Sequence, residues 1–171
     1  MPNSENRATL NPQANTAEIP ADLSPMLATL VDKPLEEPGW IYEVKWDGYR
    51  CIAYIDEGAV ELRSRNNNSF NEKFYPLLDE FKPFNSAVLD GEIVVLNEKG
   101  VADFSALQNW RSEADGALVF YAFDLLWLEG ENYMTKPYDE RRAKLNELIP
   151  DHGNIKLSKS FQVSGAEFFA I

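Results

Sequence analysis

The chain reads Glu43-Val44-Lys45-Trp46-Asp47-Gly48-Tyr49-Arg50 at its most informative point. Asp-Gly is a typical tight-turn pair, so we expect one strand before it and a returning strand over residues 49–55. Lys45 would then stand at the end of the first strand with its amine at a fixed point, and Arg50 would return near it. A covalent lysine nucleophile needs that kind of placement. Taken alone, the stretch is equally compatible with a surface hairpin that carries ordinary solvated charges.

Alternation of side chains along the first strand divides its residues between two faces. Trp40, Tyr42 and Val44 fall on one face and are expected to pack into a core. Glu43 and Lys45 fall on the other face, so the carboxylate stands beside the amine. The pattern therefore predicts a polar, reactive face on a strand whose reverse side is buried.

Three further segments carry polar residues in or directly after expected strands. They are Ser64-Arg65-Asn66, Leu89-Asp90-Gly91-Glu92 and Tyr121-Ala122-Phe123-Asp124. Together with Lys-x-Asp-Gly-x-Arg, and in this order, they resemble the nucleotidyltransferase motifs of ATP-dependent DNA ligases, RNA ligases and mRNA capping enzymes. The sequence is most similar to bacterial ATP-dependent DNA ligases of the end-joining type, whose lysine motif also reads Lys-Trp-Asp-Gly-Tyr-Arg. Pro25-Met26-Leu27-Ala28 resembles the segment that opens that group's domain.

The resemblance implies a role in ATP binding for each motif residue. Lys45 would be the nucleophile that forms a lysyl-AMP intermediate, and Glu43 would help to recognise the adenine. Phe123 would stack on the adenine ring, and Arg65 would grip a phosphate with its planar guanidinium. The expected cofactors are ATP and Mg²⁺, with Glu92 as the metal residue. The expected nucleotide-binding set is Glu43, Lys45, Arg50, Arg65, Glu92 and Phe123.

Three aspartates are expected to support this site. Asp47 belongs to the turn of the lysine motif. Asp90 shares a strand face with Glu92, and two carboxylates on one face suit a hard cation or ribose hydroxyls. Asp124 lies in an apolar strand, where an unpaired charge is costly. It therefore needs a partner such as Arg50, Lys45 or a backbone N–H.

The remaining sequence predicts an α+β fold, rich in antiparallel sheet, with helices packed on the sheet. Strands are expected at 60–63, 89–96 and 116–128. The last of these is nearly continuous in apolar residues and should be buried on both faces. Helices are expected at 76–82, 103–110 and 137–148. The resemblance implies that the fold is a nucleotidyltransferase, ATP-grasp-like adenylation domain.

Composition fits one globular domain, since 44% of the 171 residues are hydrophobic and 26% are charged. The single cysteine, Cys51, excludes an internal disulfide, and a single histidine makes a structural zinc site improbable. No apolar run is long enough to cross a membrane, so we expect a cytoplasmic, nucleoid-associated protein. Residues 1–20 are polar and are expected to form a disordered tail.

The charge balance argues against tight DNA binding by this chain alone. Only 16 Lys and Arg residues face 28 Asp and Glu residues, a net charge of −12, whereas DNA ligands usually present a basic face. The later motifs of the ligases, a Glu-Gly strand and a Lys-x-Lys strand, have no match before Ile171. Nor does the oligonucleotide-binding barrel. Residues 21–171 are therefore expected to be an incomplete, apparently truncated adenylation domain that does not seal nicks by itself.

The function implied by the resemblance is that of an ATP-dependent DNA ligase in repair, recombination or replication. The whole enzyme would transfer AMP from ATP to its lysine and then to a 5′-phosphate in nicked or broken duplex DNA. It would act as a monomer or as part of a longer multifunctional chain. The sequence leaves open an RNA ligase, a capping-type guanylyltransferase and a non-catalytic nucleotide-binding module.

Overall fold

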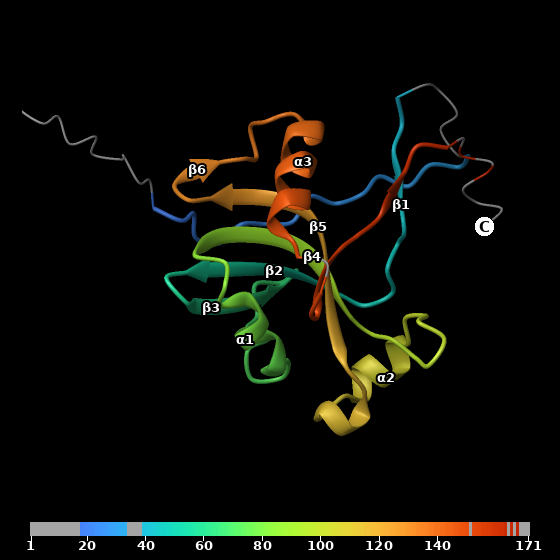
Figure 1. Cartoon of the computed structure of the whole chain (residues 1–171). Helices are drawn as coiled ribbons and strands as arrows, with labels where there is room; N and C mark the ends of the chain where they lie inside the picture. Colours follow the sequence, from blue (N-terminus) through green and yellow to red (C-terminus); the bar gives the residue numbers. More distant parts are fainter. Residues whose placement is uncertain (1–17, 34–38, 151, 164, 166, 168–171) are drawn as a thin grey trace, which may run out of the picture.

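The centre of the molecule is a six-stranded sheet, seen in a computed structural model that describes residues 18–33, 39–150, 152–163, 165 and 167. Its strands run in the order β3-β2-β4-β5-β6, and β7 pairs with β5 (Figure 1). The bounds are β2 (Tyr49–Asp56), β3 (Ala59–Ser64), β4 (Ser86–Val95), β5 (Leu118–Leu128), β6 (Glu131–Asn132) and β7 (Ile155–Leu157). The pairings are antiparallel, apart from the parallel pair β5·β7. The expected antiparallel-rich α+β fold is confirmed.

Three helices pack around this sheet, and all three were expected from their sequences. They are α1 (Pro76–Phe81), α2 (Phe104–Asn109) and α3 (Tyr138–Leu148). The Asp103 carboxylate accepts a hydrogen bond of 2.9 Å from the backbone N–H of Ala106, which caps α2. In Figure 1, α3 lies beside β5 and β6, whereas α1 lies near β3.

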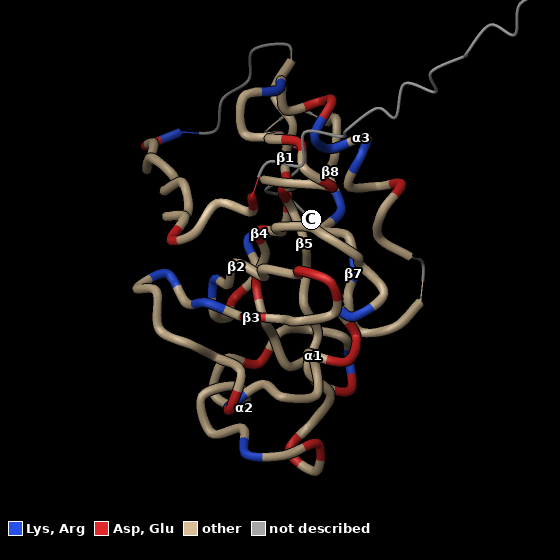
Figure 2. Tube along the Cα trace, turned by 90° about the vertical axis from the view of Figure 1, so that its left-hand side faces the viewer, with Lys and Arg blue, Asp and Glu red and all other residues tan. Residues whose placement is uncertain are grey.

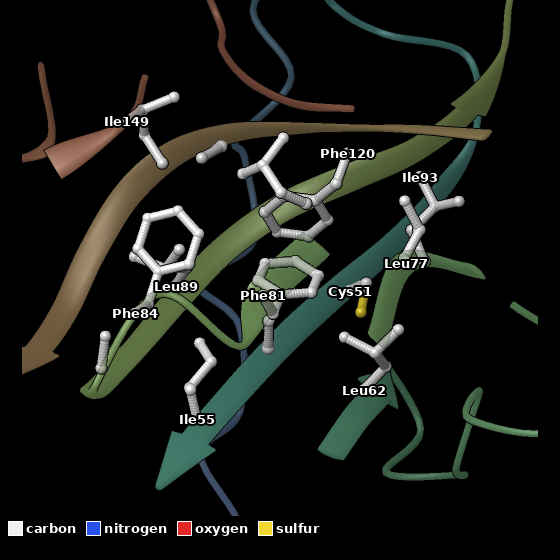
Figure 3. Packing of buried hydrophobic residues seen from close by; sticks show 14 of the residues in the cluster. Cys51, Ile55, Leu62, Leu77, Phe81, Phe84, Leu89, Ile93, Phe120 and Ile149 are labelled. Atoms are coloured by element: carbon white, nitrogen blue, oxygen red, sulfur yellow. The ribbon is translucent and has the colours of Figure 1, made fainter. Parts of the chain in front are cut away.

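The main core lies on the face of the sheet that α1 covers, and it combines aliphatic side chains with several aromatic rings. Phe74, Phe81 and Phe120 are fully buried, and the rings of Phe81 and Phe120 meet edge to face with centroids 5.0 Å apart (Figure 3). Cys51 is also fully buried, and burial raises the pKa of its thiol.

A smaller cluster covers the opposite face of the sheet. Ile52, Val88 and Trp127 form it, with Ile19 and Leu23 packed against them. Ile19 belongs to the last residues of the predicted tail, whose first 17 residues lie outside the described part of the chain. The segment from Ile19 onward therefore packs along the sheet instead of leaving it.

The predicted hairpin around Asp47-Gly48 is wrong. β1 (Tyr42–Glu43) pairs with β8 (Ser160–Phe161) in a separate two-stranded sheet, while β2 pairs with β3 and β4. The predicted burial of the apolar face is also wrong, because Trp40 and Val44 are exposed. This small sheet lies to one side of the main sheet (Figure 1), so the apolar side of β1 does not face the main core.

No helix within the described residues is both long and apolar enough to cross a membrane. Acidic and basic residues are scattered along the trace in Figure 2, and the whole sequence contains more acidic than basic residues.

Candidate active site

A cleft of about 890 Å³ brings together residues from all four sequence motifs. Its walls come from the β1–β2 connection, from β4, from β5 and from α3. The predicted site residues that line it are Glu43, Lys45, Arg50, Arg65, Asp90, Glu92, Phe123 and Asp124. Asp47 is exposed and does not line the cleft.

Lys45 reaches the cleft from the connection that follows β1, and its neighbour Trp46 fixes that connection. The Trp46 ring stacks on the Tyr121 ring of β5, with centroids 3.6 Å apart and planes inclined by 7°. Trp46 Nε1 also donates a hydrogen bond of 3.1 Å to Oγ of Ser158, which is fully buried. Lys45 is exposed, so the anchor next to it holds the backbone while the amine remains accessible.

Gly48 lies in close contact with β4 instead of forming part of a tight turn. A Cβ atom at Gly48 would lie 2.2 Å from the carbonyl oxygen of Ile93 in β4, a distance that no side chain tolerates. The glycine therefore permits a close crossing over β4. Sequence alone cannot separate this use of glycine from its use in a tight turn, since both require the missing Cβ atom.

Arg50 and Asp90 form a paired charge on the floor of the cleft. Both oxygens of the buried Asp90 carboxylate accept hydrogen bonds from Arg50, each 2.6 Å long. Burial raises the pKa of Asp90, and the Arg50 guanidinium opposes that shift. The guanidinium also lies over the Phe123 ring, 4.5 Å from its centroid. Asp90, which was expected to act together with Glu92 on a cation or on ribose hydroxyls, is therefore paired with Arg50 instead.

Glu92 remains available to a ligand. Among the described residues the Glu92 side chain forms no hydrogen bond and no salt bridge. The side chains of Lys45 and Arg65 form none either. Burial raises the pKa of Glu92 to about 7, against the opposing charges of Arg50 and Lys45. A ligand that brings a cation, or hydroxyl groups that donate hydrogen bonds, would stabilise the ionised form of Glu92.

Two acidic side chains in the cleft are held by α3, a helix that sequence reasoning did not connect with the site. Arg141 donates two hydrogen bonds to the Asp124 carboxylate, of 2.8 and 3.0 Å. Asp124 also accepts a hydrogen bond from the backbone N–H of Leu125 at 2.9 Å, the kind of donor that was expected. Arg141 takes the place that was considered for Arg50 and Lys45.

Glu43 has its own pair of partners on α3. The Tyr138 hydroxyl donates to Glu43 Oε1 at 3.0 Å, and Arg142 Nη1 lies 3.2 Å from the same oxygen. Burial raises the pKa of Glu43, while Arg142 and the Tyr138 hydrogen bond oppose the shift. The sequence did contain a signal for these partners. Arg141 and Arg142 follow Pro137, and two acids in apolar strands, Glu43 and Asp124, each require a cation.

The segment Pro25-Met26-Leu27-Ala28, which was singled out in the sequence, also lines the cleft. The Met26 carbonyl oxygen lies 3.4 Å from an Arg50 nitrogen. This segment therefore borders the cleft on the side of Arg50.

A model of the ATP dependent DNA ligase domain matches residues 25–170. The chain belongs to this family. The LigD multifunctional non-homologous end joining protein of Mycobacterium bovis is 39% identical to this ligase-domain chain over 152 residues, covering 87% of the chain and 20% of LigD. The SPbeta prophage-derived DNA ligase-like protein LigB of Bacillus subtilis is 33% identical, covering 86% of the chain and 55% of LigB.

Solved structures agree with this membership. A mycobacterial DNA ligase D complexed with ATP and MES matches with a TM-score of 0.67 and 36% identity, covering 76% of this chain and 42% of that one. The ligase domain of M. tuberculosis LigD matches with a TM-score of 0.66. The present ligase-domain chain spans about a fifth to about half of the length of these curated relatives.

Proposed function

We propose that the cleft binds ATP and that Lys45 accepts AMP from it, as the first half-reaction of an ATP-dependent DNA ligase. This proposal rests on one observation, that charged residues from three separate motifs line one cleft without a partner among the described residues. Lys45, Arg65 and Glu92 line one cleft, and within the described residues none of them forms a hydrogen bond or a salt bridge. Their charges are therefore available to a ligand that carries phosphates and hydroxyl groups.

The proposed transfer forms one bond and breaks another. The deprotonated Nζ of Lys45 attacks the α-phosphorus, a P–N bond forms, and the P–O bond to the β-phosphate breaks with release of pyrophosphate. Arg65 would neutralise phosphate charge, and Phe123 would stack its ring on the base. Trp46 keeps the backbone of the nucleophile in register with β5 through its stack on Tyr121.

Mg²⁺ fits the cleft as an ion that ATP brings with it. Within the described residues no group of three or more His, Cys, Asp or Glu side chains is arranged to hold a metal ion. Protein-bound Mg²⁺ is usually held by one or two carboxylates together with substrate phosphates, and Glu92 can supply one. When bound, the ion would neutralise charge that develops on the phosphates.

We also propose that sealing needs more than residues 1–171. The net charge of −12 leaves little attraction for a DNA backbone, so DNA contacts would come from other segments or domains. The complete protein would pass AMP from Lys45 to a 5′-phosphate in nicked or broken duplex DNA and then join the strands. Its place would be the cytoplasm, with the nucleoid, as a monomer or within a longer multifunctional chain.

Mass spectrometry after incubation with Mg²⁺ and ATP or GTP tests the assignment of Lys45. The proteins are this chain and a longer protein that adds a downstream Lys-x-Lys motif and barrel. We expect an AMP adduct on Lys45 in the longer protein, little or none in the chain alone, and no guanylate adduct. Lys45→Ala should abolish the adduct, whereas Lys99→Ala, at an exposed turn, should not. An AMP adduct on the Lys45→Ala protein would refute the assignment, and labelling from GTP would favour capping chemistry.

A further inference from the structure

One oxygen of the Glu43 carboxylate is fixed by α3, and the other is left for a ligand. The Tyr138 hydroxyl and Arg142 Nη1 both contact Oε1, at 3.0 and 3.2 Å. Within the described residues no hydrogen bond reaches Oε2. A carboxylate held in this way presents one acceptor in a defined direction, and it has no proton to donate.

Arg142 also ties this carboxylate to the strand that carries the aromatic face. Its Nη1 lies 3.5 Å from the carbonyl oxygen of Phe123, and its Nη2 donates to the carbonyl oxygen of Ser158. One nitrogen thus contacts both the Glu43 side chain and the Phe123 backbone. A single arginine side chain, 12% exposed, therefore bridges the Glu43 carboxylate and the backbone of Phe123.

The two purine bases differ in the hydrogen-bonding group at C6, which an acceptor held in one direction would meet differently. Adenine has an exocyclic amine at C6, a hydrogen-bond donor, whereas guanine has a carbonyl oxygen there, an acceptor. If the fixed carboxylate oxygen faces the C6 carbonyl of guanine, neither acceptor has a hydrogen-bond donor. A site built around a hydrogen bond to the substrate strongly rejects an analogue that cannot form it. Free rotation of Glu43 would weaken the discrimination, because the carboxylate could turn away from the carbonyl.

We propose that Tyr138 and Arg142 are positioning residues that aim Glu43 Oε2 at the exocyclic amine of a base stacked on Phe123, so that α3 sets the preference for ATP over GTP. This inference rests on the proposed nucleotide site and adds the determinants of its base specificity. Arg142 sets the distance from Phe123, and the Tyr138 hydroxyl sets the rotation of the carboxylate. Both act on the base through Glu43.

Tyr138→Phe is the sharpest test, because it removes the hydroxyl and keeps the ring that lies 5.8 Å from Arg141. Tyr75→Phe is the matched control, since the Tyr75 hydroxyl also donates to a glutamate, Glu113, but outside the cleft. Dissociation constants are measured by NMR titration of the 171-residue chain. The ligands are ATP, GTP and purine riboside triphosphate, which has no substituent at C6.

The unaltered chain should bind ATP more tightly than either analogue. In Tyr138→Phe the ratio of GTP to ATP dissociation constants should fall about tenfold, while the affinity for purine riboside triphosphate changes less than twofold. Tyr75→Phe should leave all three constants unchanged. In a Glu43→Ala background, Tyr138→Phe should have no further effect on the ratio, because no acceptor is left for the hydroxyl to position.

The outcomes separate this inference from the proposed function. An unchanged ratio in a folded Tyr138→Phe chain that still binds ATP would overturn the role of α3 and leave the nucleotide site standing. Equal losses for all three nucleotides would do the same, because they would show a purely structural role for the hydroxyl. Failure of the unaltered chain to bind ATP would overturn the proposed function and this inference together.

Discussion

Within the described residues, charged side chains in the cleft fall into two groups, those paired with a neighbour and those that we propose are left for a ligand. Asp90 is paired with Arg50, Asp124 with Arg141, and Glu43 with Arg142. The pairing is what allows these acids to be buried, because an isolated buried charge is very costly. The group left for a ligand comprises Lys45, Arg65 and Glu92.

Phe123→Ala tests the aromatic face of the cleft. The ring is partly exposed and lies under Arg50. We expect ATP to bind at least tenfold more weakly and the unfolding free energy to fall by about 1–3 kcal/mol, less than for a fully buried ring. NMR titration and chemical denaturation measure the two effects. An unchanged ATP dissociation constant in a folded variant would assign Phe123 to the core alone.

Glu92→Gln tests the burial of the Glu92 carboxylate through its effect on how the unfolding free energy depends on pH. Burial raises the pKa of Glu92 in the folded protein to about 7, whereas in an unfolded chain the carboxyl group has its ordinary pKa of 4.5. The stability that comes from this group is therefore complete below about pH 4.5 and is lost as pH rises through about 7. Burial also raises the pKa values of Asp90 and Glu43, so these groups also contribute stability that is lost as the pH rises.

We therefore expect the unfolding free energy, measured in metal-free buffer, to fall between about pH 5 and pH 7. The fall should be smaller in Glu92→Gln than in the unaltered chain. Glu98→Gln, at an exposed turn position, should keep the original slope. Equal slopes in all three proteins would contradict the account of Glu92.

At the scale of elements, the site depends on segments that meet from distant parts of the sequence. The connection after β1 carries Lys45 and is held to β5 and to the chain after β7 by Trp46. α3 supplies partners to acids on β1 and β5. Each element thus contributes either a ligand-facing residue or the support that keeps one in place.

Trp46→Ala tests this anchor. Loss of the stack on Tyr121 and of the hydrogen bond to Ser158 should cost about 1–3 kcal/mol of unfolding free energy. Hydrogen–deuterium exchange should become faster over residues 43–48 in particular. Trp40→Ala is the control, since Trp40 is 48% exposed. Equal exchange rates over 43–48 in Trp46→Ala and the unaltered chain would show that Trp46 does not hold the segment that carries Lys45.

For the whole molecule, local sequence patterns predicted the helices and strands better than the contacts between them. Strands β2 to β5 and the three helices follow from apolar alternation, turn residues and capping, all of which act over a few residues. The β1–β2 hairpin failed because Gly48 serves a close crossing over β4. The partnership of Glu43 with Tyr138 joins positions 95 residues apart, and no local pattern could predict it. The order of the motifs supplied the remaining site residues, through resemblance.

The most direct test of the central claim is an NMR titration of the isotope-labelled 171-residue chain with Mg²⁺ and ATP. The account predicts saturable shifts at Glu43, Lys45, Arg50, Glu92 and Phe123, with little change in α2, which contributes nothing to the cleft. Binding should be weak, since the chain covers 42% of the ligase structure that was solved with ATP. Shifts confined to other parts of the chain, or none at millimolar ATP, would contradict the account.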